Sequence, residues 1–283
     1  MAVIIGDYNR KGGVGKTSSV LNIGACMSLK GKRVLLVDAD SQRNLTQFFF
    51  SGNEEIMENG RIKEGIDTIS DLLEDDLNIF NCIQSIEFTS KRKFNRRFRK
   101  ITCRLDIIPG SGELDYYGND EDMEILKKKL SLLDNEYDYI IIDFPPANNL
   151  ITMICLIACD YIIVPLNLAK DSSFHGYEDV MERCREAIND YGNTSLRVLG
   201  IFYIDTQLHK IDQKIIYEES MEENTKAAMK LFYTTIKHDY SSTQFSEGEG
   251  EPLCICCGRS EISKNYQDLT DEIIDRIEEE MGL

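Results

Sequence analysis

Short apolar runs alternate along the chain with segments whose apolar residues recur at helical spacing. Residues 2–8 form an apolar stretch, and Lys16–Leu29 then places apolar side chains on one helix face. A second apolar run, Arg33–Val37, follows Gly31, a residue type that commonly ends helices. The pattern predicts a strand, a loop, a helix and a second strand, which together form a complete βαβ unit within the first 40 residues.

The same kind of apolar run predicts further strands. Each run is short, rich in branched residues and closed by polar residues, as expected for strands buried on both faces. The runs are Asp106–Ile108, Tyr139–Ile142, Tyr161–Val164, Arg197–Tyr203 and Leu231–Thr235. Helical patterns separate most of them, so we predict an α/β fold: one mostly parallel, twisted sheet with helices on both faces. We expect a single domain over residues 1–283, with ligands at the carboxyl ends of the strands.

The last helical pattern is amphipathic and should dock on the core. Ile273, Ile274 and Ile277 lie on one face of Asp271–Glu280, and acidic residues cover the other. Apolar runs such as Ile151–Ala158 are too short for a membrane-spanning helix, which needs about 20 residues. The N-terminal residues lack the features of a signal peptide. We therefore expect a soluble, cytoplasmic protein that binds no membrane.

Composition restricts the partners of this chain. Its 283 residues are 42% apolar and 29% charged, and the formal net charge of −17 disfavours binding of polyanions over the general surface. The exception is Lys91–Lys100, with seven basic residues and no acid, within a predicted basic insertion at about residues 86–104. Nine scattered cysteines in a chain of this size indicate reduced thiols.

A glycine-rich loop joins the first predicted strand to the first helix. Glycines at positions 12, 13 and 15 let backbone N–H groups surround an anion, and the helix N-terminus adds its positive dipole end. Lys16 can reach the β- and γ-phosphates and the Thr17 hydroxyl can ligate Mg²⁺. Arg10 stands where the common P-loop motif has glycine. A turn that binds nothing is disfavoured by the flanking strand and helix, so we predict nucleotide binding by Lys11, Gly12, Gly13, Val14, Gly15, Lys16, Thr17 and Ser18.

Three segments carry a resemblance to a known family. The sequence Lys-Gly-Gly-Val-Gly-Lys-Thr resembles the deviant Walker A motif of the MinD/ParA class of P-loop ATPases. Val34–Thr46 resembles the ParA segment after the second strand, although Ser41 and Arg43 replace the usual Pro and Gly. Tyr137–Ala147 resembles the Walker B strand and switch loop. The resemblance continues almost to the end of the chain, through Asp160–Pro165, Ser173–Tyr177 and Asn265–Glu272.

The resemblance implies a ParA-like ATPase. Such a protein binds ATP and Mg²⁺, closes into a nucleotide-sandwich homodimer and hydrolyses ATP slowly until a ParB-like activator stimulates it. Lys11 of one subunit would reach the nucleotide of the other. The implied role is to partition or position a plasmid, a mobile element or a chromosome region, with the protein in the cytoplasm and associated with the nucleoid.

Two aspartates close neighbouring predicted strands. Asp143 is placed to hold a Mg²⁺-bound water, and Asp40 to position the attacking water. We therefore predict Lys11, Lys16 and Asp40 as catalytic residues, and Thr17, Asp143 and Asp40 as Mg²⁺ ligands, partly through water. Either carboxylate has an alternative role as a helix cap. For Asp38, support of the metal site and a structural role are equally favoured.

The chain departs from the ParA pattern where the base and DNA are bound. Ile204 and Lys237 lie near the positions where the family usually has the residues that frame the adenine, so we assign no residue to adenine binding. The helix from Asp212 onward lacks most of the usual basic residues. Contacts to non-specific DNA are instead predicted in the basic insertion, with a solvated hairpin tip or a protein contact as alternatives, at Lys91, Arg92, Lys93, Arg96, Arg97, Arg99 and Lys100.

Other features leave competing functions open. Cys254 and Cys257 form a Cys-x-x-Cys pair, which suits Fe–S or Zn, although buried or chance thiols are favoured. His175, His209 and His238 are isolated and are predicted to be surface or helix-cap residues. The alternatives to partition are a MinD-like positioning ATPase, which would need a basic amphipathic C-terminal helix, an Fe–S carrier ATPase, and a nucleotide-switched regulator that does not bind DNA.

Overall fold

The computed structural model describes residues 1–50, 56–58, 61–74, 77–94, 97–118, 122–146, 148–167, 175–204 and 230–283. The strands are β1 (Val3–Asp7), β2 (Val34–Asp38), β3 (Met57–Glu58), β4 (Arg61–Ile62), β5 (Gln84–Phe94), β6 (Arg97–Ile108), β7 (Tyr139–Asp143), β8 (Tyr161–Asn167) and β9 (Arg197–Ile204). The helices are α1 (Lys16–Leu29), α2 (Asn44–Phe50), α3 (Ile69–Glu74), α4 (Ile79–Cys82), a 3₁₀ turn at Gly112–Tyr116, α5 (Ile125–Ser131), α6 (Leu150–Ala158), α7 (His175–Asn189), α10 (Tyr240–Glu249), α11 (Leu253–Cys256) and α12 (Glu261–Met281).

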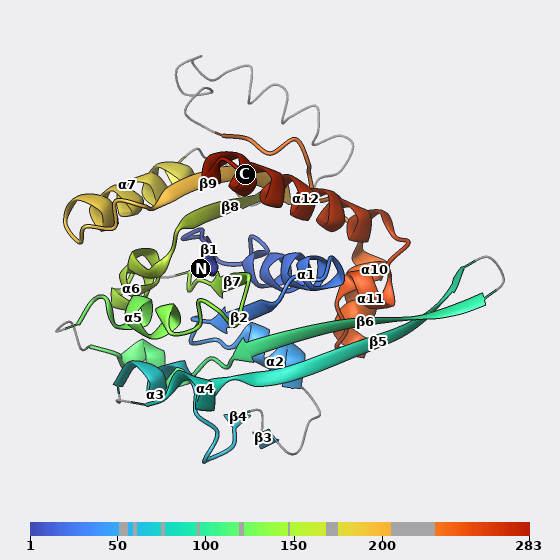
Figure 1. Ribbon diagram of the computed structural model, residues 1–283, viewed down its shortest axis with the longest axis horizontal. Coiled ribbons are helices and arrows are strands. Elements are labelled where there is room, and N and C mark those ends of the chain that lie inside the picture. Colours follow the sequence, from blue (N-terminus) through green and yellow to red (C-terminus); the bar gives the residue numbers. More distant parts are fainter. Residues whose placement is uncertain are drawn as a thin grey trace.

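Seven strands form one sheet in the order β5-β6-β2-β7-β1-β8-β9 (Figure 1). Every neighbouring pair is parallel except β5 and β6, which are antiparallel. The strands β1, β2 and β7 are almost completely buried because helices cover both faces, which is why they consist largely of Val, Ile and Leu. The predicted α/β fold with a mostly parallel sheet is confirmed.

One predicted strand was wrong. The segment Leu231–Thr235 makes only an isolated parallel bridge, between Leu231 and Ile201 of β9. The guanidinium of Arg276 on α12 donates to the carbonyl of Leu231, which therefore has a side-chain partner instead of a neighbouring strand. The segment thus runs beside β9, where the Phe232 amide donates to the Ile201 carbonyl and the Ile236 amide to the Tyr203 carbonyl, but it does not form a continuous strand.

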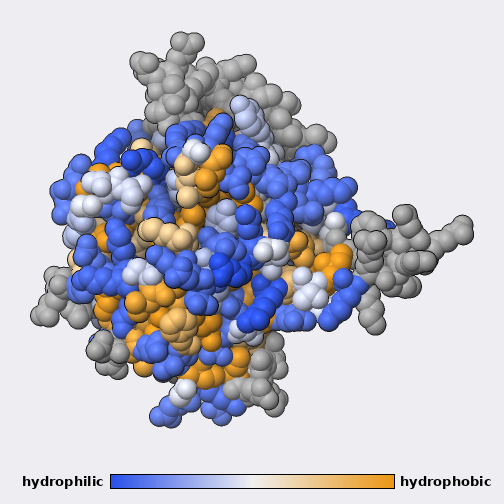
Figure 2. Space-filling model, viewed as in Figure 1, coloured by the Kyte–Doolittle hydropathy of each residue, from blue (hydrophilic) through white to orange (hydrophobic). Residues whose placement is uncertain are grey.

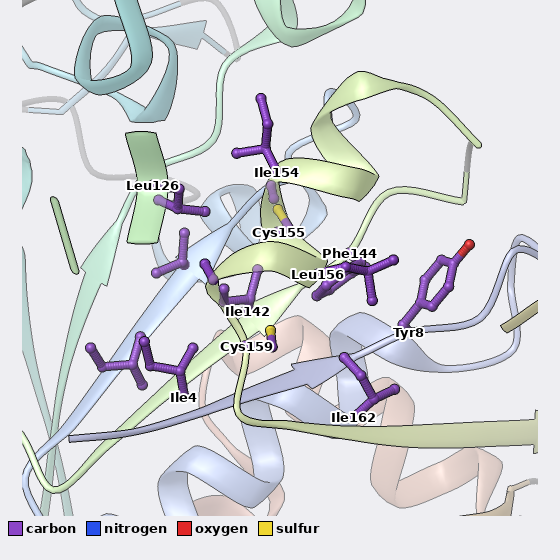
Figure 3. Close-up of a cluster of buried hydrophobic side chains, with 14 of the residues drawn as sticks. Ile4, Tyr8, Leu126, Ile142, Phe144, Ile154, Cys155, Leu156, Cys159 and Ile162 are labelled. Carbon is purple, nitrogen blue, oxygen red and sulfur yellow. The ribbon is translucent and has the colours of Figure 1, made fainter. Parts of the chain in front are cut away.

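The core is divided by the sheet into two apolar clusters. One packs α5, α6 and α7 against one face, and Figure 3 shows part of it, where Ile154, Cys155 and Leu156 of α6 approach the strands. Tyr8 and Phe144 lie side by side in this cluster, with their ring centroids 5.1 Å apart. The other cluster packs α1, α11 and α12 against the opposite face. Helices therefore lie on both sides of the sheet, as the sequence predicted.

The helix at the C-terminus is longer than the amphipathic pattern indicated. It begins at Glu261, where the Ser260 side chain accepts a hydrogen bond from the Ser263 amide, and continues to Met281. Ile273 and Ile277 are buried against the sheet, and Glu279 and Glu280 are among the exposed residues of its last turn. The predicted docking of this helix on the core is confirmed.

The antiparallel pair β5 and β6 forms a long hairpin, here called the basic hairpin (Gln84–Ile108). Its register runs without interruption from Gln84 opposite Ile107 to Phe94 opposite Arg97. Figure 1 shows the hairpin extending past α10 and α11, away from the body of the molecule. The predicted insertion at about residues 86–104 thus falls within it.

Most of the predicted DNA contacts lie beyond what can be described of this hairpin. Arg96 is outside the described residues, and the structure gives only the backbone course of Lys91, Arg92, Lys93, Arg97 and Arg99. Lys100 is exposed and lies 3.7 Å from a carboxylate oxygen of Glu87 on the facing strand. The helix expected from Asp212 onward, together with His209, also falls outside the described residues.

Hydrophilic residues cover most of the face drawn in Figure 2, with smaller apolar patches among them. Within the described ranges, no helix has both the length and the apolar character that crossing a membrane requires.

Candidate functional site

A cavity of about 870 Å³ opens at the carboxyl ends of the parallel strands, and is here called the central cavity. Its size is within the range of ligand-binding pockets, about 300–1,000 Å³. The glycine-rich loop and the start of α1 form one wall, and the loop after β2 with α2 forms another. The remaining lining comes from the ends of β8 and β9 and from α10, α11 and α12. The structure therefore places the cavity where the topology of an α/β sheet predicts a ligand.

The glycine-rich loop has the backbone conformation that its glycines allow. Gly13 and Gly15 have φ values of 69° and 97°, in the left-handed region that side-chain-bearing residues rarely adopt. Gly15 directly precedes α1, and a Cβ atom there would lie 2.9 Å from the Cδ1 of Ile204. Backbone conformation thus favours glycine at both positions, and at Gly15 the side chain of Ile204 also restricts the space. All seven residues from Gly12 to Ser18 line the central cavity.

Asn9, which the sequence analysis did not single out, holds this loop against the sheet. Its side-chain amide donates to the carbonyl of Pro165 on β8 at 2.8 Å, and its Oδ1 accepts from the Lys11 amide at 2.9 Å. A polar residue that directly follows a buried strand is the only sequence signal for this role. The bonds fix the entry of the loop to a neighbouring strand.

Lys16 is the buried cation of the site. Its side chain is only 6% exposed, and its Nζ donates to the carbonyls of Asn9 at 2.9 Å and Lys11 at 3.2 Å. Both acceptors belong to the loop, so the ammonium lies within the curve that the loop makes. A multiply charged anion in the central cavity would meet this cation and the N-terminus of α1 together.

Asp7, Asp143 and Asp38 occupy equivalent positions on three adjacent strands and are here called the carboxylate row. Asp7 of β1 is paired in register with Asp143 of β7, and Asp143 in turn with Asp38 of β2. Residues paired across parallel strands project from the same face of the sheet, and the strands are about 4.8 Å apart. All three are completely buried. The row therefore concentrates three carboxyl groups within two strand spacings.

Asp38 differs from its neighbours because its hydrogen bonds are satisfied within the chain. It accepts from the Thr46 amide at 2.8 Å, from the Thr46 hydroxyl at 2.6 Å and from the Asp40 amide at 3.2 Å. Burial raises its pKa to about 6, against these hydrogen bonds, which lower it. The contacts tie β2 to the start of α2, so the geometry favours the structural role of the two roles considered for Asp38.

The carboxylate oxygens of Asp7 and Asp143 have no hydrogen-bond partner in the described part of the chain. Burial raises the pKa of Asp143 well above its usual value, and Asp38 raises it further, whereas the nearby Thr17 hydroxyl and Lys16 lower it. Burial likewise raises the pKa of Asp7, with Asp143 adding to the rise and Lys16 opposing it. A buried carboxylate without partners is costly, so each of them requires an explanation.

The donor set suits a magnesium ion. Mg²⁺ prefers oxygen ligands and is usually bound through one or two carboxylates together with substrate phosphates. Thr17 lies on the lining of the central cavity, and Asp143 offers two oxygens that no protein group occupies. Asp143 itself is buried behind this lining, so the structure brings it next to Thr17 but not to the surface of the cavity.

Asp40 reaches the cavity directly. It is 6% exposed and lines the cavity, and its carboxylate accepts from the Gln42 amide at 3.0 Å. Burial raises the pKa of Asp40, while the Gln42 amide and Lys16 lower it. The predicted neighbourhood of Asp40 and Lys16 is therefore present, with the carboxylate facing the space that the loop surrounds.

The rest of the cavity lining comes from segments that are distant in the sequence. Ile204 and Lys237, which the sequence analysis placed near the adenine, both line it. Sequence reasoning missed the other residues here, because they lie on elements that only the fold brings together: Phe48, Asn167, Ile236, Tyr240 and Tyr266.

Other predicted residues lie in different places. Lys11 is exposed and stands outside the lining of the central cavity. His238 is exposed as predicted, but it also lines the cavity, which the sequence did not reveal. Cys254 is buried in the core and the Cys257 thiol donates to the Ser242 carbonyl. Among the described residues, no group of three or more metal-binding side chains includes these cysteines.

Comparisons with known proteins agree with this geometry. The model of the family AAA_31, described as an AAA domain, matches residues 2–198. The sporulation initiation inhibitor protein Soj of Bacillus subtilis is 27% identical over 276 residues, which cover 96% of this chain and 98% of that protein. The chromosome-partitioning ATPase Soj of Treponema pallidum is 26% identical over 269 residues, 95% of each chain.

A solved structure shares the fold. Cobyrinic acid a,c-diamide synthase from Mycobacterium smegmatis, with bound ADP and magnesium, superposes with a TM-score of 0.71 at 20% sequence identity. The match covers 100% of this chain and 97% of the synthase. At this identity the likeness establishes the fold, that of the P-loop NTPases.

Proposed function

This chain belongs to the AAA domain family AAA_31 and, with its Soj relatives, to the ParA family of partition ATPases, and we propose that it uses ATP and Mg²⁺ to partition or position DNA. The observation that carries the proposal is the meeting of Lys16, Thr17 and Asp40 at one end of the central cavity, with Asp143 directly behind them. Binding of ADP and magnesium by the synthase of the same fold supports it.

In the proposed site, the glycine-rich loop and Lys16 bind the β- and γ-phosphates, and the N-terminus of α1 adds its unpaired amides. Thr17 and Asp143 would hold Mg²⁺, Asp143 partly through water, and the bound ion would supply positive charge beside the phosphates. Asp40 accepts a hydrogen bond from the attacking water and orients it toward the γ-phosphate. Phosphoryl transfer depends mainly on such positioning and charge neutralisation, which these residues provide.

The exposed Lys11 fits a role across a subunit interface. It stands at the rim of the phosphate-binding loop but not on the lining of its own cavity. In a homodimer formed on ATP binding, Lys11 of each subunit would contact the nucleotide of the other and complete its catalytic site. Hydrolysis by one subunit alone would then be slow, and a ParB-like activator would accelerate it by stabilising the complete arrangement.

The basic hairpin is the proposed surface for non-specific DNA. It concentrates seven cations within Lys91–Lys100 on a chain with a net charge of −17, and it extends away from the acidic body (Figure 1). Binding of DNA phosphates requires such a local positive field, because acidic surfaces repel the duplex. The hairpin thus supplies the positive field that the helix from Asp212 lacks in sequence.

Retention on duplex DNA without a specific site tests this function. The purified chain should be retained with ATP and released with ADP, and a combined variant Arg96→Glu, Arg97→Glu and Arg99→Glu should lose retention. The variant should also flatten the dependence of affinity on salt, by about one unit of log–log slope per lost phosphate contact.

A matched control changes the net charge equally at other exposed positions, with Lys128→Glu, Arg197→Glu and Lys264→Glu. This control should keep its retention. Equal losses in both variants would show that the hairpin has no special role. No retention in any nucleotide state would favour the nucleotide-switched regulator over a partition protein.

A MinD-like function at a membrane has less support. Membrane-surface helices present basic residues to anionic lipids, whereas the last turns of α12 contain Glu278, Glu279 and Glu280.

A further inference from the structure

Asp7 is the buried ionisable group that the proposed chemistry leaves unused. It lies at the last position of β1, one of the most buried strands of the sheet, and its exposure is 0%. Val3 and Ile5, which share its face of the strand, pack against the apolar cluster around α1 and α12. An apolar residue at position 7 would continue this pattern and add to the packing. Asp7 instead places an ionisable group in the same buried position.

The environment of Asp7 does not explain the acid as a structural residue. Both of its carboxylate oxygens are buried, and no hydrogen-bond donor from the described residues reaches either one. Asp38, at the other end of the carboxylate row, shows what a structural carboxylate in this row looks like, with three donors around it. Burying a carboxylate without such partners destabilises a fold, unless a ligand supplies the compensating charge.

The position of Asp7 indicates which ligand that is. Its side chain projects from the same face as that of Asp143, one strand spacing away, because the two residues are paired in register. The ionised groups that act on Asp7 are Asp143, which repels it, and Lys16, the one nearby cation. In the proposed site, the Lys16 ammonium interacts with the phosphates. No other nearby cation then compensates the adjacent carboxylates of Asp7 and Asp143.

We propose that Asp7 is a second carboxylate of the divalent-cation site, acting beside Asp143 to strengthen the binding of Mg²⁺ together with nucleotide. Sites for this ion commonly use one or two carboxylates along with substrate phosphates. Asp143 supplies the carboxylate ligand, and Asp7 adds a second negative charge behind it from the neighbouring strand. Because Asp7 lies deeper than the lining of the central cavity, it acts through Asp143 or through a bound water and is a positioning residue.

The inference rests on the proposed binding of Mg²⁺ and nucleotide in the central cavity, and its test separates the two. The full-length chain is titrated with a fluorescent ADP analogue, first in EDTA and then over a series of Mg²⁺ concentrations. Two variants remove the charge: Asp7→Asn keeps the shape and polarity, and Asp7→Val restores the apolar pattern of β1.

Both variants should need about tenfold more Mg²⁺ for half-maximal tightening of nucleotide binding, the usual cost of removing a group that supports a metal ligand. Their affinity for the analogue in EDTA should be unchanged or higher, because a repulsive charge near the phosphates is gone. The melting temperature of the nucleotide-free chain should rise in both variants, since the unpartnered charge is removed. Asp160→Asn, a change of a partly buried acid at the amino end of β8, is the control and should match the wild type in its Mg²⁺ requirement and in its affinity in EDTA.

Two results would overturn the inference while leaving the proposed function intact. One is an unchanged Mg²⁺ requirement in both variants. The other is a fall in the melting temperature of both variants, which would identify Asp7 as a residue that stabilises the fold. Failure of the wild type to bind the analogue at any Mg²⁺ concentration would instead contradict nucleotide binding itself, and this inference with it.

Discussion

Aspartates at the two ends of the central strands differ in whether they have hydrogen-bond or ion-pair partners. At the amino ends, Asp160 accepts from the Ile4 amide at 2.9 Å, and Asp138 binds the Arg33 guanidinium at 2.8 Å. At the carboxyl ends, Asp7 and Asp143 have no partner among the described residues. The amino-end pair and Asp38 therefore form contacts that hold the fold together, whereas Asp7 and Asp143, beside Asp38 at the carboxyl ends, do not.

The pKa directions set Asp138 apart from the aspartates at the carboxyl ends, whereas the pKa of Asp160 is raised by burial like theirs. The Arg33 guanidinium lowers the pKa of Asp138, as in an ordinary ion pair, whereas burial raises the pKa of Asp143 and of Asp7. Groups with strongly perturbed pKa values and no structural partner gather at functional sites. The two strand-end aspartates without a partner, Asp7 and Asp143, both lie at the end of the sheet where the glycine-rich loop lies.

Removing the charge of Asp143 should have the largest effect. In Asp143→Asn the oxygens proposed to hold Mg²⁺ are weakened, and ATP hydrolysis should fall on the order of 1,000-fold, because metal binding contributes several kcal/mol to phosphoryl transfer. Release of phosphate at saturating ATP measures the loss. The melting temperature of the nucleotide-free variant should not fall, since no hydrogen bond is lost. A loss of activity accompanied by unfolding would instead place Asp143 with the structural carboxylates.

Stability of the nucleotide-free chain should decrease as the pH rises. Burial raises the pKa of Asp38 from 3.8 to about 6, and those of Asp7 and Asp143 rise as well. A carboxyl with a raised pKa binds its proton more tightly in the folded state. Its stabilising contribution is therefore complete below about pH 4, the pKa of an unfolded Asp, and is lost as the pH passes through the folded value.

For Asp38 this shift corresponds to about 2–3 kcal/mol between pH 4 and pH 7. Urea midpoints at pH 5.5 and 7.5 test the direction, and the higher midpoint is expected at pH 5.5. Asp7→Asn removes one of the groups responsible, so its two midpoints should lie closer together than those of the wild type. A higher urea midpoint at pH 7.5 than at pH 5.5 would contradict the prediction, because it would show that the aspartates at the carboxyl ends stabilise the fold in their ionised form.

Substitution of an aspartate at the amino ends of the strands should have the opposite effect: it should lower the stability of the fold and leave ATP hydrolysis unchanged. Asp160→Ala leaves the Ile4 amide buried without an acceptor, which should cost about 1–2 kcal/mol of unfolding free energy. Asp160→Asn keeps a side-chain oxygen and should recover most of it. Hydrolysis per folded molecule should stay at the wild-type level in both, because the site is at the other end of β1 and β8. A tenfold change in hydrolysis would break the separation between the two ends.

Sequence alone was sufficient to predict those parts of the site that lie within one short, recognisable segment. The helix Lys16–Leu29 has the predicted bounds, since the glycine-rich loop before it and Gly31 after it are both explicit signals. Asp40 and Asp143 were found because each follows an apolar run. Spacing along the chain was sufficient for these residues, because the loop, its helix and the ends of two strands each have a recognisable order.

Residues that depend on register or on distant elements were not predictable. Asp7 looks like the polar end of a strand, and only its pairing with Asp143 shows that it belongs to a row of carboxylates. Tyr240 and Phe48 meet at the cavity from opposite parts of the chain. The segment at Leu231 was predicted as a strand because its contacts depend on distant residues, among them Arg276, which lies 45 residues later and donates to the Leu231 carbonyl.

The smallest predicted effect concerns the backbone at the carboxyl end of β2. Arg43 has a φ of 57°, the left-handed conformation, and stands where the sequence pattern of ParA proteins has glycine. Its amide donates to the carbonyl of Asp40 at 2.9 Å, so the strained residue closes the turn that presents the proposed catalytic carboxylate. Local strain of this kind is another cost carried at the end of the sheet where the site lies.

Arg43→Gly should relieve the strain and raise the unfolding free energy by about 0.5–1 kcal/mol, partly offset by the greater flexibility of glycine in the unfolded chain. Arg43→Ala is the control, because it removes the same side chain but keeps the constraint on φ, and it should not stabilise. Urea denaturation of the three proteins measures the difference. If Gly and Ala behave alike, the arginine side chain rather than the backbone determines stability here, and strain is not part of what distinguishes the two ends of the sheet.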